Sequence, residues 1–312
     1  MSTTLHTLGF PRMGAQRELK FALETYWRQD SSLDALQDTG AALRERHWQT
    51  QKQAGLDWVT VGDFAYYDHM LNHIQWLGCE PARFGFTDEE PDLQRAFAMA
   101  RGVAQEEGAG DGGTFALEMT KWFDTNYHYL VPEFLPDTSF SDNADRLLAE
   151  VDQAQALGHQ AKVVLVGPLS FLWLGKEKQA GFDRFSLLER LLPAYESILS
   201  RLAARGVEWV QLDEPILGLD LPDAWRHAFE RVYWQLARSA PRILLASYFS
   251  PLDDNLRMAC QLPVAGLHVD AVRAPDELLR VADWLAAPHK VLSVGVVDGR
   301  NIWRTDLEAA LA

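Results

Sequence analysis

Short apolar runs alternate with amphipathic stretches along this chain. Seven runs are nearly continuous in hydrophobic residues and end in polar residues or glycine, and they occupy residues 7–10, 58–62, 162–167, 207–212, 242–247, 266–269 and 290–297. Continuous rather than alternating hydrophobicity is typical of parallel strands that are buried on both faces. The pattern therefore predicts seven strands, each followed by a helical stretch.

The clearest helix has apolar residues at a spacing of three and four. They are Leu187, Leu188, Leu191, Leu192, Tyr195, Ile198, Leu199 and Leu202. Alternating strands and helices over this length favour an α/β fold of the (β/α)8 TIM-barrel type. A doubly wound sheet is less favoured because no nucleotide-binding loop marks a switch point in strand order.

The strand count leaves two alternatives open. Residues 115–120 are an eighth candidate, but residues 121–129 do not have a helical pattern, so the segment is either a barrel strand or an excursion. If it is an excursion, the barrel is incomplete at its C-terminal end. The last residues, RTDLEAALA, have the pattern of an unfinished helix without a C-cap glycine. We expect one domain over residues 1–312, truncated within its fold, with an open edge that invites pairing with another chain.

Residues 88–113 are expected to form an inserted helix followed by a glycine-rich loop. The loop satisfies GxGxxG through Gly108, Gly110 and Gly113. A dinucleotide site needs a strand before this motif and a helix after it, whereas here a helix precedes and a strand follows. A flexible turn is the favoured interpretation.

Composition narrows the compartment and the partners. The formal net charge is −15, which disfavours nucleic acid and anionic membranes as partners. The two cysteines, Cys79 and Cys260, fit no metal-binding spacing, and no apolar run approaches membrane-spanning length. The first residues lack the basic and apolar regions of a signal peptide. We expect a cytoplasmic protein.

The first strand–helix unit carries the candidate binding residues. In the helix after PRMGAQ, Leu19 and Leu23 fall on one face, and Arg17, Lys20 and Glu24 fall on the opposite one. Two cations near the positive end of a helix would attract a carboxylate. The alternative, a solvated face with weak ion pairs, is favoured by spacing alone.

The run LGFPRMGAQRELKFALETYW resembles the opening of the cobalamin-independent methionine synthases. Further segments resemble that family in the same order, among them DWVTVGDFAYYDHML, EMTKWFDTNYHYLVPEF, VLVGPLSFLWLGK, WVQLDEPILGLDL, SYFSPLDDNL, GLHVDAVR and VLSVGVVDGRNIWR. The resemblance implies an N-terminal barrel that faces a second barrel related by duplication. It also implies that zinc in the second, C-terminal barrel, absent from this chain, activates the thiol of homocysteine, while methyltetrahydrofolate with a polyglutamate tail supplies the methyl group.

By the same resemblance, Arg17, Glu18, Leu19 and Lys20 match the folate-binding RELK, and Lys121 matches a second folate contact. A triglutamate tail carries several carboxylates, which an acidic protein must meet with local cations. These five residues are the predicted substrate-binding residues for 5-methyltetrahydropteroyltri-L-glutamate.

Acidic residues and a histidine at three strand ends raise the question of a metal. Asp213 and Glu214 form a DEP motif, which we interpret as ordering loops rather than as catalytic, and His268 and Asp270 lie two residues apart. Zinc wants three or four ligands in tetrahedral reach. A trio of His268, Asp270 and Asp213 is conceivable, but a structural role is simpler. We therefore predict no metal, no cofactor and no catalytic residue in this chain.

The resemblance leads to one functional prediction and one rival. The intact protein would transfer the methyl group of 5-methyltetrahydropteroyltri-L-glutamate to L-homocysteine and make L-methionine, and this chain alone would be inactive. The rival is a stand-alone, non-catalytic folate-binding or scaffold barrel.

Overall fold

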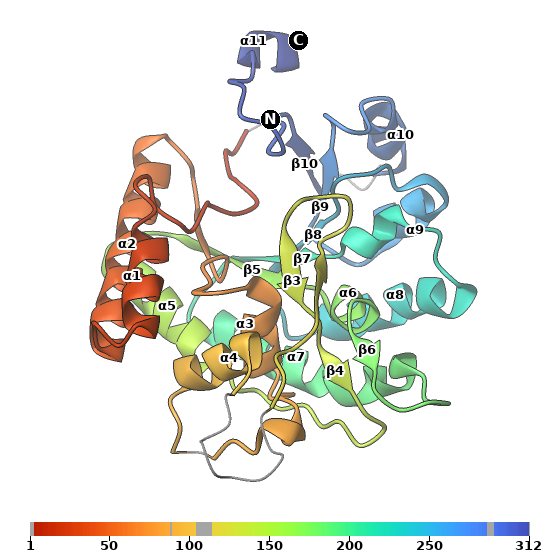
Figure 1. The fold of residues 1–312 in the computed structure, drawn as a ribbon. Helices are drawn as coiled ribbons and strands as arrows, with labels where there is room; N and C mark the ends of the chain where they lie inside the picture. The colour runs from red at the N-terminus through yellow and green to blue at the C-terminus, as the bar shows by residue number, and fades with distance from the viewer. Residues whose placement is uncertain (1–2, 88, 104–113, 286–289, 312) are drawn as a thin grey trace.

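A six-stranded parallel sheet forms the centre of the protein in the computed structural model, which describes residues 3–87, 89–103, 114–285 and 290–311. The strand order is β1–β5–β7–β8–β9–β10. The strands are β1 (Val59–Val61), β5 (Ala161–Val166), β7 (Trp209–Asp213), β8 (Arg242–Ala246), β9 (Gly266–Asp270) and β10 (Val291–Gly295). Six of the seven predicted strands are thereby confirmed, and the curled sheet fits an incomplete barrel (Figure 1).

Helices follow the strands and cover the sheet (Figure 1). They are α1 (Glu18–Trp27), α2 (Leu33–Gln53), α3 (His69–Trp76), α4 (Asp92–Arg101), α5 (Asp145–Ala156), α6 (Pro168–Trp173), α7 (Leu188–Ala204), α8 (Asp223–Leu236), α9 (Leu256–Gln261), α10 (Glu277–Trp284) and α11 (Leu307–Leu311). All eight apolar residues of the stripe predicted at 187–202 are buried, along α7 and directly before it. No described helix has the length and apolar character needed to cross a membrane.

The two faces of the sheet differ in character. Side chains alternate between faces along a strand, so Val163, Val210 and Leu267 lie on one face and Lys162 and Gln211 lie on the other. The first face is aliphatic and belongs to the hydrophobic core. The second face carries buried polar side chains and forms the interior of the incomplete barrel.

The predicted strand at residues 7–10 is wrong, because the described residues before α1 contain no strand. The backbone N–H and C=O groups of residues 7–10 form hydrogen bonds with side chains rather than with a neighbouring strand. Lys162 Nζ donates to Thr7 O over 2.7 Å, Gln211 Nε2 donates to Leu8 O over 3.0 Å, and Phe10 N donates to Asp63 Oδ2 over 2.7 Å. The segment therefore lies along the polar face of the sheet.

The segment at 115–120 is an excursion and not a barrel strand. Its end forms β2 (Met119–Lys121), which pairs in antiparallel fashion with β3 (His128–Leu130) outside the main sheet. A further small pair joins β4 (Glu133–Phe134) to β6 (Lys176–Glu177). The helix expected within residues 88–113 is α4, whereas the glycine-rich loop lies outside the described residues.

Gly40 marks a close approach between α2 and the segment after β1. A Cβ atom at this position would lie 2.1 Å from the hydroxyl oxygen of Tyr66, which is buried. Although alanine is the better helix former, we expect Gly40→Ala to lower the free energy of unfolding by about 1–3 kcal/mol through overpacking. Chemical denaturation measures this, with the exposed neighbour Asp38→Ala as control. A stabilised Gly40→Ala protein would contradict the packing.

Candidate functional site

The predicted RELK residues lie at the start of α1 and divide into exposed and engaged side chains. Arg17 is the N-cap residue, with a left-handed φ of 62° and an exposed side chain. Glu18 Oε2 accepts a hydrogen bond from Gln16 N over 2.9 Å, and Oε1 lies 2.6 Å from the guanidinium of Arg46. Backbone hydrogen bonds, including the one from Gln16, lower the pKa of Glu18.

Leu19 and Lys20 point in opposite directions from α1. Leu19 is fully buried and belongs to the core. Lys20 is half exposed, and its ammonium lies 3.7 Å from the carboxylate of Glu24 one turn later. An exposed pair of this kind contributes little to stability, so Lys20 can exchange its partner for a ligand at small cost. Arg17 and Lys20 are therefore two exposed cations at the start of α1.

Lys121 ends β2, on a hairpin separate from the main sheet. It pairs in register with His128 of β3, and its side chain is exposed. Trp122 N donates to Tyr127 O over 2.7 Å and closes the loop between the two strands. The hairpin thus presents Lys121 beside a loop rich in aromatic residues.

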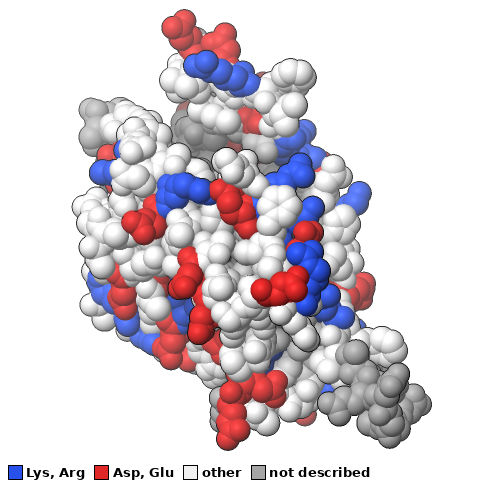
Figure 2. Space-filling model, turned by 60° about the vertical axis from the view of Figure 1, so that its left-hand side comes forward, with Lys and Arg blue, Asp and Glu red and all other residues white. Residues whose placement is uncertain are grey.

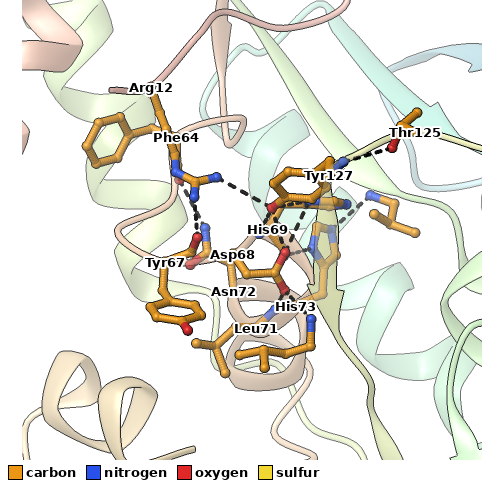
Figure 3. Close-up of polar contacts among 12 residues, drawn as sticks. Arg12, Phe64, Tyr67, Asp68, His69, Leu71, Asn72, His73, Thr125 and Tyr127 are labelled. Atoms are coloured by element: carbon orange, nitrogen blue, oxygen red, sulfur yellow. Dashed lines mark hydrogen bonds and ion pairs between the residues drawn. The ribbon is translucent and has the colours of Figure 1, made fainter. Parts of the chain in front are cut away.

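A set of polar contacts joins this hairpin to the segment that leads into α1 (Figure 3). We call Arg12, Asp68, His69 and Tyr127 the hairpin junction. Arg12 donates from Nη1 to the hydroxyl of Tyr127 over 3.4 Å and from Nη2 to the carbonyl of Tyr67. The Tyr127 hydroxyl donates to Asp68 Oδ1 over 2.6 Å, and His69 Nδ1 lies 3.1 Å from the same hydroxyl. The junction connects the two parts of the chain that hold the predicted cations.

Asp68 is the centre of the hairpin junction and is almost completely buried. Its Oδ2 accepts from Leu71 N over 3.0 Å, which caps α3, and from Leu130 N over 3.1 Å, which fixes β3. Burial raises the pKa of Asp68, and burial together with Arg12 lowers the pKa of His69 to about 3. His69 is therefore neutral near pH 7 and acts as a hydrogen-bonding anchor.

None of the four residues of the hairpin junction is among the binding residues predicted from sequence. Contacts across 115 residues, between Arg12 and Tyr127, and across 62 residues, between Asp68 and Leu130, leave no periodic pattern. The available signal was the position of Asp68 directly before a helical stretch, where aspartate is a preferred N-cap.

A second polar network fills the interior face of the sheet. Lys162 Nζ lies 3.0 Å from His6 Nδ1 and donates to Gln211 Oε1. His6 Nε2 lies 2.8 Å from Ser293 Oγ, which lies 2.8 Å from His268 Nδ1. When Lys162 is charged, its ammonium can only donate, so His6 then accepts at Nδ1 and donates from Nε2. Burial lowers the pKa of Lys162 to about 7.

Asp213 and Glu214, the DEP carboxylates, belong to two different environments. Asp213 accepts from Gln211 Nε2 over 2.7 Å and from the hydroxyl of Tyr248 over 3.1 Å, and burial raises its pKa to about 6. Glu214 is completely buried and accepts from Ser170 N over 2.7 Å at the start of α6. Glu214 thus orders the loop that begins α6.

The conceivable metal trio is already hydrogen-bonded to other groups. His268 bonds to Ser293, and the Asp270 oxygens accept from the backbone N–H groups of Phe249, Val272 and Arg273. Across the described ranges, no three His, Cys, Asp or Glu side chains are grouped to hold a metal ion.

Cationic side chains do not dominate the surface. Figure 2 shows lysine and arginine interspersed with aspartate and glutamate over the visible face, in a chain of net charge −15. An anionic ligand would depend on a few local cations, because the overall field repels it.

Comparisons with known proteins identify the family of this chain. A family model described as "Cobalamin-independent synthase, N-terminal domain" matches residues 4–312. The chain is 55% identical, over 99% of its length, to proteins named 5-methyltetrahydropteroyltriglutamate–homocysteine methyltransferase from Burkholderia pseudomallei and Burkholderia thailandensis. It spans only 40% of the length of these relatives.

Solved structures support the fold. A putative vitamin-B12-independent methionine synthase from Listeria monocytogenes aligns with a TM-score of 0.61 over 99% of this chain and 83% of that one, at 13% identity. A B12-independent methionine synthase from Shewanella sp. W3-18-1 aligns with a TM-score of 0.58 over 87% and 74%, at 14% identity. With a family model that covers nearly every residue and curated relatives at 55% identity, this chain belongs to the cobalamin-independent synthase family, of which it represents the N-terminal domain.

Proposed function

We propose that this chain is the folate-handling N-terminal half of an enzyme that transfers the methyl group of 5-methyltetrahydropteroyltri-L-glutamate to L-homocysteine to make L-methionine. The supporting observation is the 55% identity over 99% of the chain to relatives named for that reaction. Because the chain spans 40% of their length, we propose that a second, C-terminal barrel completes the site. The proposed compartment is the cytoplasm.

Arg17, Lys20 and Lys121 are the proposed anchors for the glutamate tail. Each carries an exposed positive charge, and the tail offers several carboxylates. Charge-assisted hydrogen bonds are the strongest available to such a ligand. Glu18 and Leu19 would contribute differently: Glu18 is engaged with Arg46 and so orders the start of α1, and Leu19 fixes α1 on the core.

The chemical step would depend on residues outside this chain. Zinc held by the C-terminal barrel would make the homocysteine thiol nucleophilic by favouring its thiolate. The part of this chain would be to bind and orient the methyl donor through its tail. The chain alone, supplied with zinc and both substrates, is therefore expected to form no methionine, and detection of methionine would contradict the proposal.

Removal of one proposed cationic anchor should weaken binding of the triglutamate more than binding of the monoglutamate. We expect Lys121→Ala to raise the Kd for the triglutamate about three- to tenfold, as the loss of one charge-assisted contact implies. The Kd for the monoglutamate should change little. Isothermal titration calorimetry with both ligands measures this, at two salt concentrations because the effect should shrink as salt screens it.

Lys52→Ala is the matched control, since Lys52 is an exposed lysine in the last turn of α2. Its Kd values should equal those of the unsubstituted chain. If the unsubstituted chain binds the two ligands equally, or if Lys121→Ala leaves the preference for the triglutamate intact, the charge-anchor assignment is wrong.

A further inference from the structure

The loop between β2 and β3 is held from two sides by arginines that come from opposite ends of the chain. On one side, Arg12 of the segment before α1 donates to the hydroxyl of Tyr127, and its guanidinium carbon lies 5.8 Å from the centre of the Tyr127 ring. Tyr127 in turn bonds to buried Asp68. This side fixes the end of the loop that leads into β3.

On the other side, Arg300 of the segment after β10 forms an ion pair and hydrogen bonds with Asp124. Its Nη1 lies 2.9 Å from both carboxylate oxygens, and its Nη2 donates to the carbonyl of Asp124 over 2.6 Å. The guanidinium carbon also lies 5.7 Å from the centre of the Phe249 ring. Three hydrogen bonds from one planar group define both the position and the orientation of Asp124.

The backbone directly before Asp124 is in a conformation that needs support. Phe123 has φ of 51°, and Phe249, whose ring centre lies 6.4 Å from that of Phe123, has φ of 76°. Residues other than glycine rarely adopt this left-handed backbone conformation, and it is unfavourable for bulky residues such as phenylalanine. Such a conformation persists when surrounding contacts hold it in place. The two arginines supply contacts of this kind directly beside Lys121.

We infer that Arg12 and Arg300 are positioning residues for Lys121: they clamp the loop at residues 122–127 and so fix where the Lys121 ammonium meets the glutamate tail. This inference rests on the proposed function, because it assumes that Lys121 binds the tail. Neither arginine needs to contact the ligand. Their effect on ligand binding would be transmitted through the loop. It would therefore disappear when Lys121 is replaced by an uncharged residue.

The first test is a comparison of ligand preference in single and double variants. Arg12→Gln and Arg300→Gln should each lower the preference for the triglutamate over the monoglutamate by about fivefold, within the range of coupling between residues of one network. In a Lys121→Ala background the same substitutions should have no further effect. Tyr127→Phe, which removes only one hydroxyl, should act like Arg12→Gln while leaving the packing intact.

The second test needs no ligand. Hydrogen exchange of the amides at residues 122–127 should accelerate in Arg12→Gln and Arg300→Gln, while exchange in α7 should stay unchanged. Arg28→Gln is the control, since Arg28 is an exposed arginine paired with Asp30 beyond the end of α1. It should change neither the exchange nor the ligand preference.

Failure of the inference and failure of the proposed function give different results. If the unsubstituted chain shows no dependence on tail length, or if Lys121→Ala keeps the full dependence, the proposed function of Lys121 fails and the clamp with it. If Lys121→Ala lowers the preference but the arginine variants keep it, only the clamp is overturned. If the arginine variants act equally strongly in the Lys121→Ala background, they act independently of Lys121, and the positioning role is excluded.

Discussion

Replacing Glu214 by alanine should lower the free energy of unfolding by about 3–5 kcal/mol, because several buried hydrogen-bond donors lose their acceptor. The carboxylate accepts hydrogen bonds from Leu169 N, Ser170 N and the Tyr233 hydroxyl, and it is completely buried. Alanine would leave three buried donors without an acceptor. Each such group costs about 1–3 kcal/mol. Urea denaturation at pH 7 measures the loss.

Glu214→Gln should lose much less, about 1 kcal/mol, because the amide keeps one acceptor oxygen. Burial raises the pKa of Glu214 from its ordinary value of 4.5 to about 7. The folded state therefore binds more protons than the unfolded state between these values, and the stability that Glu214 contributes falls as the pH rises through this window. The deficit of Glu214→Gln should accordingly be smaller at pH 7.5 than at pH 5. An equal deficit at both would contradict the raised pKa.

The second large effect is expected for Lys162→Met, which should lower the free energy of unfolding by about 3 kcal/mol, since buried acceptors lose their donor. Lys162 is almost completely buried, and its ammonium binds His6, Thr7 O and Gln211. Without it the segment at residues 5–10 loses its main contact with β5. Thermal and urea unfolding measure the change, and Lys52→Met is the exposed control.

The pH dependence of this variant has the opposite sign to that of Glu214→Gln. Burial lowers the pKa of Lys162 from 10.5 to about 7, so between these values the unfolded state binds more protons and stability rises with pH. The deficit of Lys162→Met should therefore grow by about 1.4 kcal/mol per pH unit. Urea denaturation at pH 7.5 and pH 9.0 tests this. A constant deficit would show that Lys162 titrates normally in the folded protein.

The sheet could be predicted from sequence because its strands are buried on both faces and are therefore continuous in hydrophobic residues. The same pattern led to the wrong strand at residues 7–10, where the backbone pairs with the side chains of Asp63, Lys162 and Gln211 instead of a strand. Hydrophobicity identifies burial, and it does not identify which group accepts or donates each backbone hydrogen bond.

The candidate site was predictable only in part for a related reason. The alternation of Leu19 with Lys20 follows from helical periodicity, and the structure places the first in the core and the second at the surface. The assignment of Lys121 came from the resemblance, since spacing alone says nothing of a lone exposed lysine. The hydrogen bonds of Arg12 and Arg300 are tertiary contacts, which no local sequence pattern encodes. The bond between Arg300 and Asp124 spans 176 residues.

The bond between His6 and Ser293 has a consequence for the order of folding. The two residues are 287 positions apart, and Figure 1 places the start of the chain beside β10. During synthesis, His6 leaves the ribosome long before Ser293, so it must wait until β10 has been made before this contact can form. Contacts of such large sequence separation slow folding because the loop entropy is lost before the contact is gained. The N-terminal segment should therefore join the sheet last, and refolding followed by pulse-labelled exchange should protect β5 and β7 before the backbone of residues 5–10.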